Sequence, residues 1–284
     1  MEILDQIINM EPMRILLILV IGLVVGFLIG LTGIGGGVLS LPALTEILGV
    51  ESTVAVGTAS LYASLTKIYA VFEHYRLKTI DFISSCIFLS GALPGCIIVG
   101  YITVKSLEGL SKTEQLSYQQ NFKLLIAYIL LLTVFILVFN FISFLKKESS
   151  SEPVKIEKPN TKKQIIGAML GVFIGALIGV SSIGGGALVI PVLIILFGLS
   201  AKETVGSSIF IGVLLTLATA IIYGKGGQLD YGIAILMAFG SILGVFFGTR
   251  LTEKVPDKIL QGLVIGIITL ACITMLVRAH MAIN

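Results

Sequence analysis

The chain has 284 residues, of which 56% are hydrophobic and only 12% are charged, and its formal net charge is +3 at pH 7. A soluble globular domain averages about 25% charged residues, so the composition excludes an ordinary soluble domain and predicts an all-α polytopic membrane protein. The apolar runs are continuous rather than alternating, which argues against a β-barrel. There is no basic patch interleaved with aromatic residues, so we do not expect nucleic acid as a partner.

Five apolar segments fill the first half of the chain. They lie at 14–31, 38–48, 52–72, 79–104 and 121–145. The second segment has only about 11 residues, and at about 1.5 Å per residue it cannot cross a hydrocarbon core of about 30 Å alone. Polar loops are expected at 74–78 and at 105–120.

A lysine-rich segment, 146–163, follows with six lysines, three glutamates and two prolines. It has no apolar periodicity, so we interpret it as a solvated linker. Apolar segments then recur in the same order, at 164–181, 187–197, 203–223, 229–249 and 258–277. The predicted organisation is an N-terminal transmembrane repeat at 14–145, the linker at 146–163 and a C-terminal transmembrane repeat at 164–278.

The two halves share a gapless pattern. The glycine-rich stretch 26–37 returns at 175–186, and the proline that closes the next short apolar run recurs as Pro42 and Pro191. The same offset of 149 residues relates several further pairs of residues: Gly49 and Gly198, Gly57 and Gly206, Thr58 and Ser207, Asp81 and Asp230, Gly91 and Gly240, Gly95 and Gly244. An internal repeat in so apolar a chain predicts two copies of one membrane unit, which is a common build for a transporter.

Basic residues suggest how the units are oriented. The lysine-rich linker is expected in the cytoplasm, and so is the 74–78 loop with Arg76 and Lys78. Following the segments from the linker in both directions predicts two inverted units, each with a glycine-interrupted re-entrant hairpin and about three spanning helices. A parallel arrangement of the two units stays open if the first segment of each unit crosses fully.

The two triple-glycine loops are the main candidates for a substrate site. Glycines let the backbone bend sharply and let a ligand approach closely, and the free N–H groups where the next helix starts favour an anion. Irregular backbone at membrane depth is tolerated only where it is buried or lines a cavity. The candidate substrate-binding residues are Thr32, Gly35, Gly36, Gly37, Gly57, Thr58, Ser181, Gly184, Gly185, Gly186, Gly206 and Ser207.

Each candidate has a plainer alternative. The four-residue spacing of Gly22, Gly26 and Gly30 is typical of close helix packing. Hydroxyls such as Thr58 can also bond to carbonyls of their own helix. Lys67, inside the third segment, either extends to the interface or attracts anions. Asp81 and Asp230 are expected to cap the segments that they begin.

With these motifs in place, the chain resembles the sulfite exporter TauE/SafE family. The resemblance extends from Ile15 to about Leu276 and is carried by four markers in order: 31–37 with Pro42, 56–58, 183–186 with Pro191, and 205–208. It implies a multi-pass permease of the cytoplasmic membrane for small sulfur-containing anions such as sulfite or sulfoacetate. The second copy has Ser182 where the first has Gly33, so the two loops are not equivalent.

We therefore expect a secondary transporter that binds a small anion near the membrane midplane, between two units that rock about the site. An anion channel is an alternative. A membrane enzyme is another, although no histidine lies deep in a span and no Gly-x-Ser-x-Gly motif is present. No cofactor or metal is expected, because the three cysteines and two histidines form no ligand motif. The expected partners are the small anionic substrate and the lipid bilayer.

Overall fold

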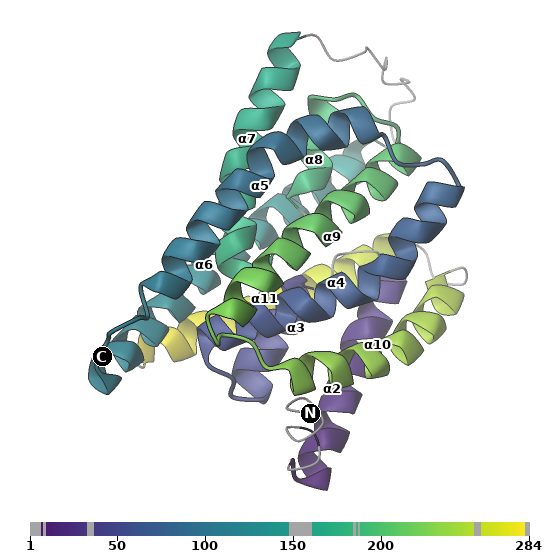
Figure 1. Ribbon diagram of the computed structural model, residues 1–284. Coiled ribbons are helices and arrows are strands. Elements are labelled where there is room, and N and C mark those ends of the chain that lie inside the picture. Colours follow the sequence, from purple (N-terminus) through teal and green to yellow (C-terminus); the bar gives the residue numbers. More distant parts are fainter. Residues whose placement is uncertain are drawn as a thin grey trace.

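The computed structural model describes residues 7, 10–32, 37–147, 161–183, 186, 188–252 and 257–281, and these residues form helices and turns without a strand. The helices of the first half (Figure 1) are α2 (Pro12–Thr32), α3 (Gly37–Pro42), the π-helical turn η1 (Ala43–Ile47), α4 (Ser52–Arg76), α5 (Phe82–Lys105) and α6 (Lys112–Lys147). Those of the second half are α7 (Thr161–Ser181), α8 (Val189–Ile195), α9 (Ala201–Lys225), α10 (Tyr231–Thr252) and α11 (Asp257–Met281).

The expectation of an all-helical membrane protein is confirmed. Within the described chain, seven helices are long and apolar enough to cross a membrane by length and composition: α2, α4, α5, α6, α7, α9 and α10. Both α2 and α7 have 21 residues, which corresponds to about 31 Å. The first segment of each half is therefore long enough to span, while the short α3 and α8 are not, and the re-entrant hairpins stay a prediction.

The loop expected at 105–120 is shorter than predicted: it follows the end of α5 at Lys105, but α6 already begins at Lys112. The reason is a helix start signal in the sequence Ser111–Glu114. The Ser111 backbone N–H and hydroxyl both donate to Glu114 Oε2, at 2.8 and 2.7 Å, and the Glu114 N–H donates back to Ser111 Oγ at 3.4 Å. This reciprocal cap satisfies the free donors at the helix start and lengthens α6 to 36 residues.

Glycines let α2 pack against α10 with their backbones in contact. A Cβ atom placed on Gly22 would overlap the carbonyl oxygen of Met237, and one on Gly26 would overlap that of Ser241. Because the contact positions rise together along both helices, α2 and α10 run in the same direction. The packing interpretation of the spaced glycines is therefore confirmed at these two positions.

The helices α5 and α7 pack in the same way. Gly171 lies against the carbonyl of Phe88, Gly175 against that of Ala92, and Gly179 against that of Cys96. The offset of 149 residues that relates Gly22 to Gly171 also relates Met237 to Phe88. Each of the two pairs thus joins one helix from each half of the chain.

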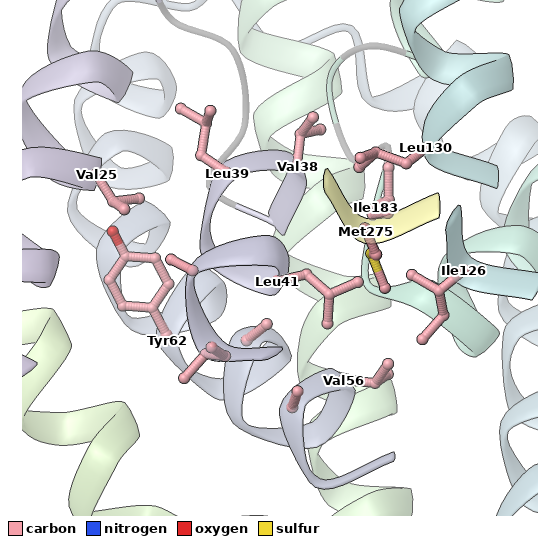
Figure 2. Close-up of a cluster of buried hydrophobic side chains, with 14 of the residues drawn as sticks. Val25, Val38, Leu39, Leu41, Val56, Tyr62, Ile126, Leu130, Ile183 and Met275 are labelled. Atoms are coloured by element: carbon pink, nitrogen blue, oxygen red, sulfur yellow. The ribbon is translucent and has the colours of Figure 1, made fainter. Parts of the chain in front are cut away.

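The largest hydrophobic cluster surrounds α3. Figure 2 shows Leu41 of α3 beside Ile126 of α6 and Met275 of α11, with Val38 and Ile183 nearby. All of these side chains are buried. Ile183, the residue directly before the second triple-glycine loop, therefore packs in the same core as α3, the helix that follows the first such loop.

A carboxylate in this region forms ion pairs with α6 and α11. Glu46 of η1 lies 2.6 Å from Lys123 Nζ of α6 and 3.2 Å from Arg278 Nη1 of α11. Only 10% of the Glu46 side chain is exposed. In the second half the equivalent position is Ile195, so this network, which joins the first half to Arg278 of the second, has no counterpart there.

Candidate functional site

The two glycine-rich loops meet in the structure. A Cβ atom placed on Gly37, the first residue of α3, would overlap the backbone carbonyl of Ser182, which directly follows α7. Of the predicted site residues, Gly35, Gly36, Gly184 and Gly185 lie outside the described residues, as does the side chain of Thr32 in the last turn of α2. The contact between Gly37 and Ser182 is thus the described part of the junction between the loops.

Ser181 and Ser182 shape the end of α7. The Ser181 hydroxyl donates to the carbonyl of Leu177 at 2.6 Å and accepts from the N–H of Ile183 at 3.2 Å, so it is fully used within the turn. Ser182 has a φ of 56°, which is the left-handed region that favours glycine. The first copy has Gly33 at the equivalent position, so the Ser182 substitution adds strain together with a hydroxyl.

Three buried hydroxyls have no hydrogen-bond partner among the described residues: Ser40, Ser60 and Ser182. Their side chains are at most 2% exposed. Leaving a buried hydroxyl without a partner costs about 1–3 kcal/mol, so each is a candidate ligand donor. Ser40 lies one helical turn after Gly37, on α3. Ser60 lies on α4.

Sequence reasoning did not consider Ser40 and Ser60, and it left Ser182 out of the predicted site, because it favoured residues that recur in both halves. The equivalents of Ser40 and Ser60 are Val189 and Ile209. The signal that could have revealed them is a lone hydroxyl at a position where the other copy has an apolar residue.

The second predicted patch lies elsewhere. Thr58 Oγ1 accepts from the backbone N–H of Asp230 at 3.0 Å, and Gly57 lies against the carbonyl of Gln228. These contacts join α4 to the turn between α9 and α10. The carboxylate of Asp230 accepts from the N–H of Ile233 at 2.9 Å, so its predicted capping role is confirmed.

The equivalent patch on α9 makes equivalent contacts. Ser207 Oγ accepts from the N–H of Asp81 at 2.9 Å, and Gly206 lies against the carbonyl of Thr79. Asp81 caps α5 through the N–H of Ile83. The structure therefore brings Gly57 and Thr58 to one interhelical turn and Gly206 and Ser207 to another, and each hydroxyl bonds a neighbouring segment rather than its own helix.

Gly186 lies in a turn three residues before the start of α8. Its carbonyl accepts from the N–H of Ile190 at 3.0 Å, and the residue is half-buried. Among the residues searched, no group of three or more His, Cys, Asp or Glu side chains is arranged to hold a metal ion.

Comparison with known proteins gives one consistent result. A family model described as sulfite exporter TauE/SafE matches residues 18–275. A protein named probable membrane transporter protein YjnA of Bacillus subtilis is 32% identical over 251 residues, which is 88% of this chain and 95% of the relative. No solved structure matches the chain.

Two further relatives carry the same description. Probable membrane transporter protein YunE of Bacillus subtilis is 26% identical, over 87% of this chain and 91% of its own length. Probable membrane transporter protein MJ0441 of Methanocaldococcus jannaschii is 27% identical, over 86% and 89%. The seven candidate spans agree with a multi-pass membrane protein. The chain thus belongs to the sulfite exporter TauE/SafE family of membrane transporters.

Proposed function

We propose that the protein is a secondary transporter of the cell membrane that carries small anions, sulfur-containing oxyanions or organosulfonates among them. The anion binds between the two halves of the chain, where the glycine loops approach each other. The sulfur class comes from the description of the family. The relatives' printed names say only that they are probable membrane transporters.

The proposal rests on one observation above all: the buried Ser182 hydroxyl, without a partner in the described chain, lies where the two loops touch. An oxyanion needs hydrogen-bond donors in a site that excludes water, and a hydroxyl provides one without placing a charge in the membrane. Ser40, one turn from Gly37, offers a second donor. The glycine loops and Thr32 complete the proposed site, while Ser181, whose hydroxyl is occupied within its turn, shapes the end of α7.

The proposal includes two inverted units, at 14–145 and 164–278, joined by a cytoplasmic linker at 146–163. Helix direction supports it. In Figure 1, α5 and α7 start at the top of the view, whereas α2 starts at the bottom. Equivalent contacts between Gly22 and Met237 and between Gly171 and Phe88 support it as well. In this arrangement the Thr58 and Ser207 patches lie at opposite ends of the protein and fix the turns that flank access to the site.

Uptake of labelled sulfite and sulfoacetate into proteoliposomes tests the function, with and without a pH gradient and against protein-free vesicles. We expect saturable uptake by the protein. Rates equal to those of empty vesicles for both compounds would refute the sulfur-anion assignment. Counterflow separates the rival mechanisms, because a carrier accumulates labelled anion against unlabelled anion on the other side, whereas an open channel does not.

The site is tested by Gly37→Ala, because the added methyl group would collide with the Ser182 carbonyl and push the loops apart. We expect uptake to fall to the background while the protein still inserts into the membrane. The matched control is Gly266→Ala in α11, where nothing lies within 4 Å of an added Cβ. Unchanged uptake by folded Gly37→Ala protein would show that the anion site is not at this junction.

That the protein has no enzymatic activity stays a prediction.

A further inference from the structure

One face of α4 is polar along most of its length. Thr53, Gly57, Ser60, Ser64 and Lys67 follow one another at spacings of four and three residues, which places them on one face of the helix. The first four are buried and Lys67 is partly buried. The polar face of α4 is therefore turned into the protein.

The side of α4 next to this face points outward. Leu65, Ile68 and Phe72 are 39%, 54% and 56% exposed, as expected for side chains that contact lipid. A lysine on the inner face cannot be explained as an ordinary surface residue of this helix.

Lys67 lies well inside the membrane-crossing part of α4. It is nine residues before Arg76, the last residue of the helix, which is about 14 Å along the axis. If α4 is centred in the bilayer, Lys67 is roughly 10 Å inside the hydrocarbon core. Ionisable residues at such depth face the interior or a water-filled cavity and mark paths for charged substrates.

No carboxylate compensates this charge among the side chains that the structure describes. The described ion pairs connect Glu46 with Lys123 and with Arg278, and neither includes Lys67. A cation at this depth needs an anionic partner, because solvation by lipid is poor. A bound anion could provide such a partner.

Ser60 provides an independent sign of a ligand. It lies two turns before Lys67 on the same face, it is fully buried, and its hydroxyl has no partner in the described chain. Ser64, between them, donates to the carbonyl of Leu61 at 2.8 Å. A charge and a free donor thus lie on one face, as a bound oxyanion requires.

The far end of the polar face meets a small cavity. The N–H of Thr53 donates to Gln119 Oε1 at 3.1 Å, and Gln119 Nε2 donates to Thr53 Oγ1 at 2.7 Å. Gln119 and Gln228 line a cavity of about 140 Å³ together with Glu51 and Glu108. The polar face therefore extends from Lys67, nearer the end of α4 at Arg76, to a start that lies beside this cavity.

We propose that Lys67 is the charge-selecting residue of this transporter: it binds the anion on the inner face of α4, with the Ser60 hydroxyl as a hydrogen-bond donor. The inference rests on the proposed anion transport and adds a binding group that the glycine loops lack. Lys67 attracts the negative charge, while the hydroxyls and backbone of the loops recognise the oxygen atoms.

Three substitutions test the role in proteoliposomes, with labelled sulfite and sulfoacetate as probes. Lys67→Thr introduces the residue that α9 has at the equivalent position, Thr216. It should raise KM about tenfold or more, or abolish uptake, and Lys67→Arg should keep most of the uptake because it keeps the charge. Ser60→Ala should raise KM by a smaller factor. The matched control is Lys225→Thr, at an exposed position at the end of α9, which should behave as wild type.

Ligand-dependent thermal unfolding of the purified protein in detergent separates this inference from the transport proposal. A ligand that binds only the folded state raises the unfolding midpoint. Sulfite or sulfoacetate should raise it for wild type and Lys225→Thr, and not for folded Lys67→Thr. If the unfolding midpoints follow this pattern but the wild type shows no uptake into vesicles, transport is refuted and anion binding at Lys67 still holds. Uptake and stabilisation unchanged in Lys67→Thr would refute the Lys67 site alone. Neither stabilisation nor uptake by wild type would refute both.

Discussion

The helices α4 and α9 take equivalent places in the two halves and pack against each other, yet their inner faces differ. Where α4 has Ser60, Ser64 and Lys67, the same offset gives α9 an isoleucine, a valine and Thr216. The Thr216 hydroxyl is satisfied by the carbonyl of Gly212 at 2.8 Å. At their starts, however, Thr58 and Ser207 make the same hydrogen bond to the same kind of turn.

The comparison separates two kinds of residue. Positions that recur in both halves build the scaffold, because glycine contacts and helix caps are needed wherever the same helices pack. Positions that differ provide the unpaired polar groups. Positions at which the two halves differ are therefore informative about the ligand.

The largest effect is expected where the copies are alike. Gly26→Ala and Gly175→Ala each force a methyl group into the backbone of the partner helix, at Ser241 and Ala92. Because backbone cannot move aside as a side chain can, each substitution should cost about 3 kcal/mol or more of unfolding free energy. Thermal unfolding in detergent measures this, with Gly266→Ala as the control. A large loss in only one of the two variants would contradict the equivalence of the two helix pairs.

The next largest loss of stability is expected at Glu46, whose ion pairs have no counterpart at the equivalent position of the second half. Glu46→Ile introduces the residue of the second half, Ile195, and leaves Lys123 without its partner. Since the Lys123 side chain is 22% exposed, solvent screens part of the loss, and we expect a cost of about 2 kcal/mol. The double variant with Lys123→Met should recover most of the stability. If the double variant is no more stable than the single one, the ion pair is not the cause.

A smaller, symmetric effect is expected from Thr58→Val and Ser207→Ala. Each removes the acceptor of a backbone N–H at the start of α10 or α5, which costs about 1 kcal/mol. The unfolding midpoint should fall similarly in both variants. Uptake measured on the same samples adds a second test, because a loss of uptake larger than the loss of folded protein would make these hydroxyls substrate ligands.

The smallest effect on stability should come from Ser182→Gly. Glycine relieves the left-handed backbone at this residue but also gains freedom in the unfolded chain, so a net stabilisation of about 0.5 kcal/mol is expected. Uptake should fall, because the free hydroxyl is lost. Lys78→Gly is the matched control, since Lys78 has a φ of 54° in a turn where the other half has Gly227. Lys78→Gly should give a similar gain in stability and leave uptake unchanged. If uptake falls equally in Lys78→Gly and Ser182→Gly, the loss comes from the changed backbone and not from the missing hydroxyl.

Much of the fold could be predicted from the sequence. All ten apolar segments are helices, because hydrophobic runs of such length leave the backbone few other ways to satisfy its hydrogen bonds. The spaced glycines correctly indicated close packing. Their partners could not be predicted, since spacing reveals that a helix is approached closely but not which helix approaches it.

The site was less accessible to sequence reasoning. The repeat led to the glycine loops, and Gly37 does meet Ser182. It also led to Thr58 and Ser207, whose hydroxyls are occupied by turns far along the chain. Whether a hydroxyl is free depends on tertiary contacts, and Ser40 and Ser60 became candidates only once those contacts were known.

The two helix pairs α2–α10 and α5–α7 have a consequence for how the molecule can move. Each pair packs through glycines with its backbones in contact, and each takes one helix from either side of the linker. Moving the two halves of the chain apart would break both sets of backbone contacts. We therefore expect the bodies that shift during transport to combine helices from both halves, which differs from the rocking of whole units, 14–145 against 164–278, that the sequence predicts.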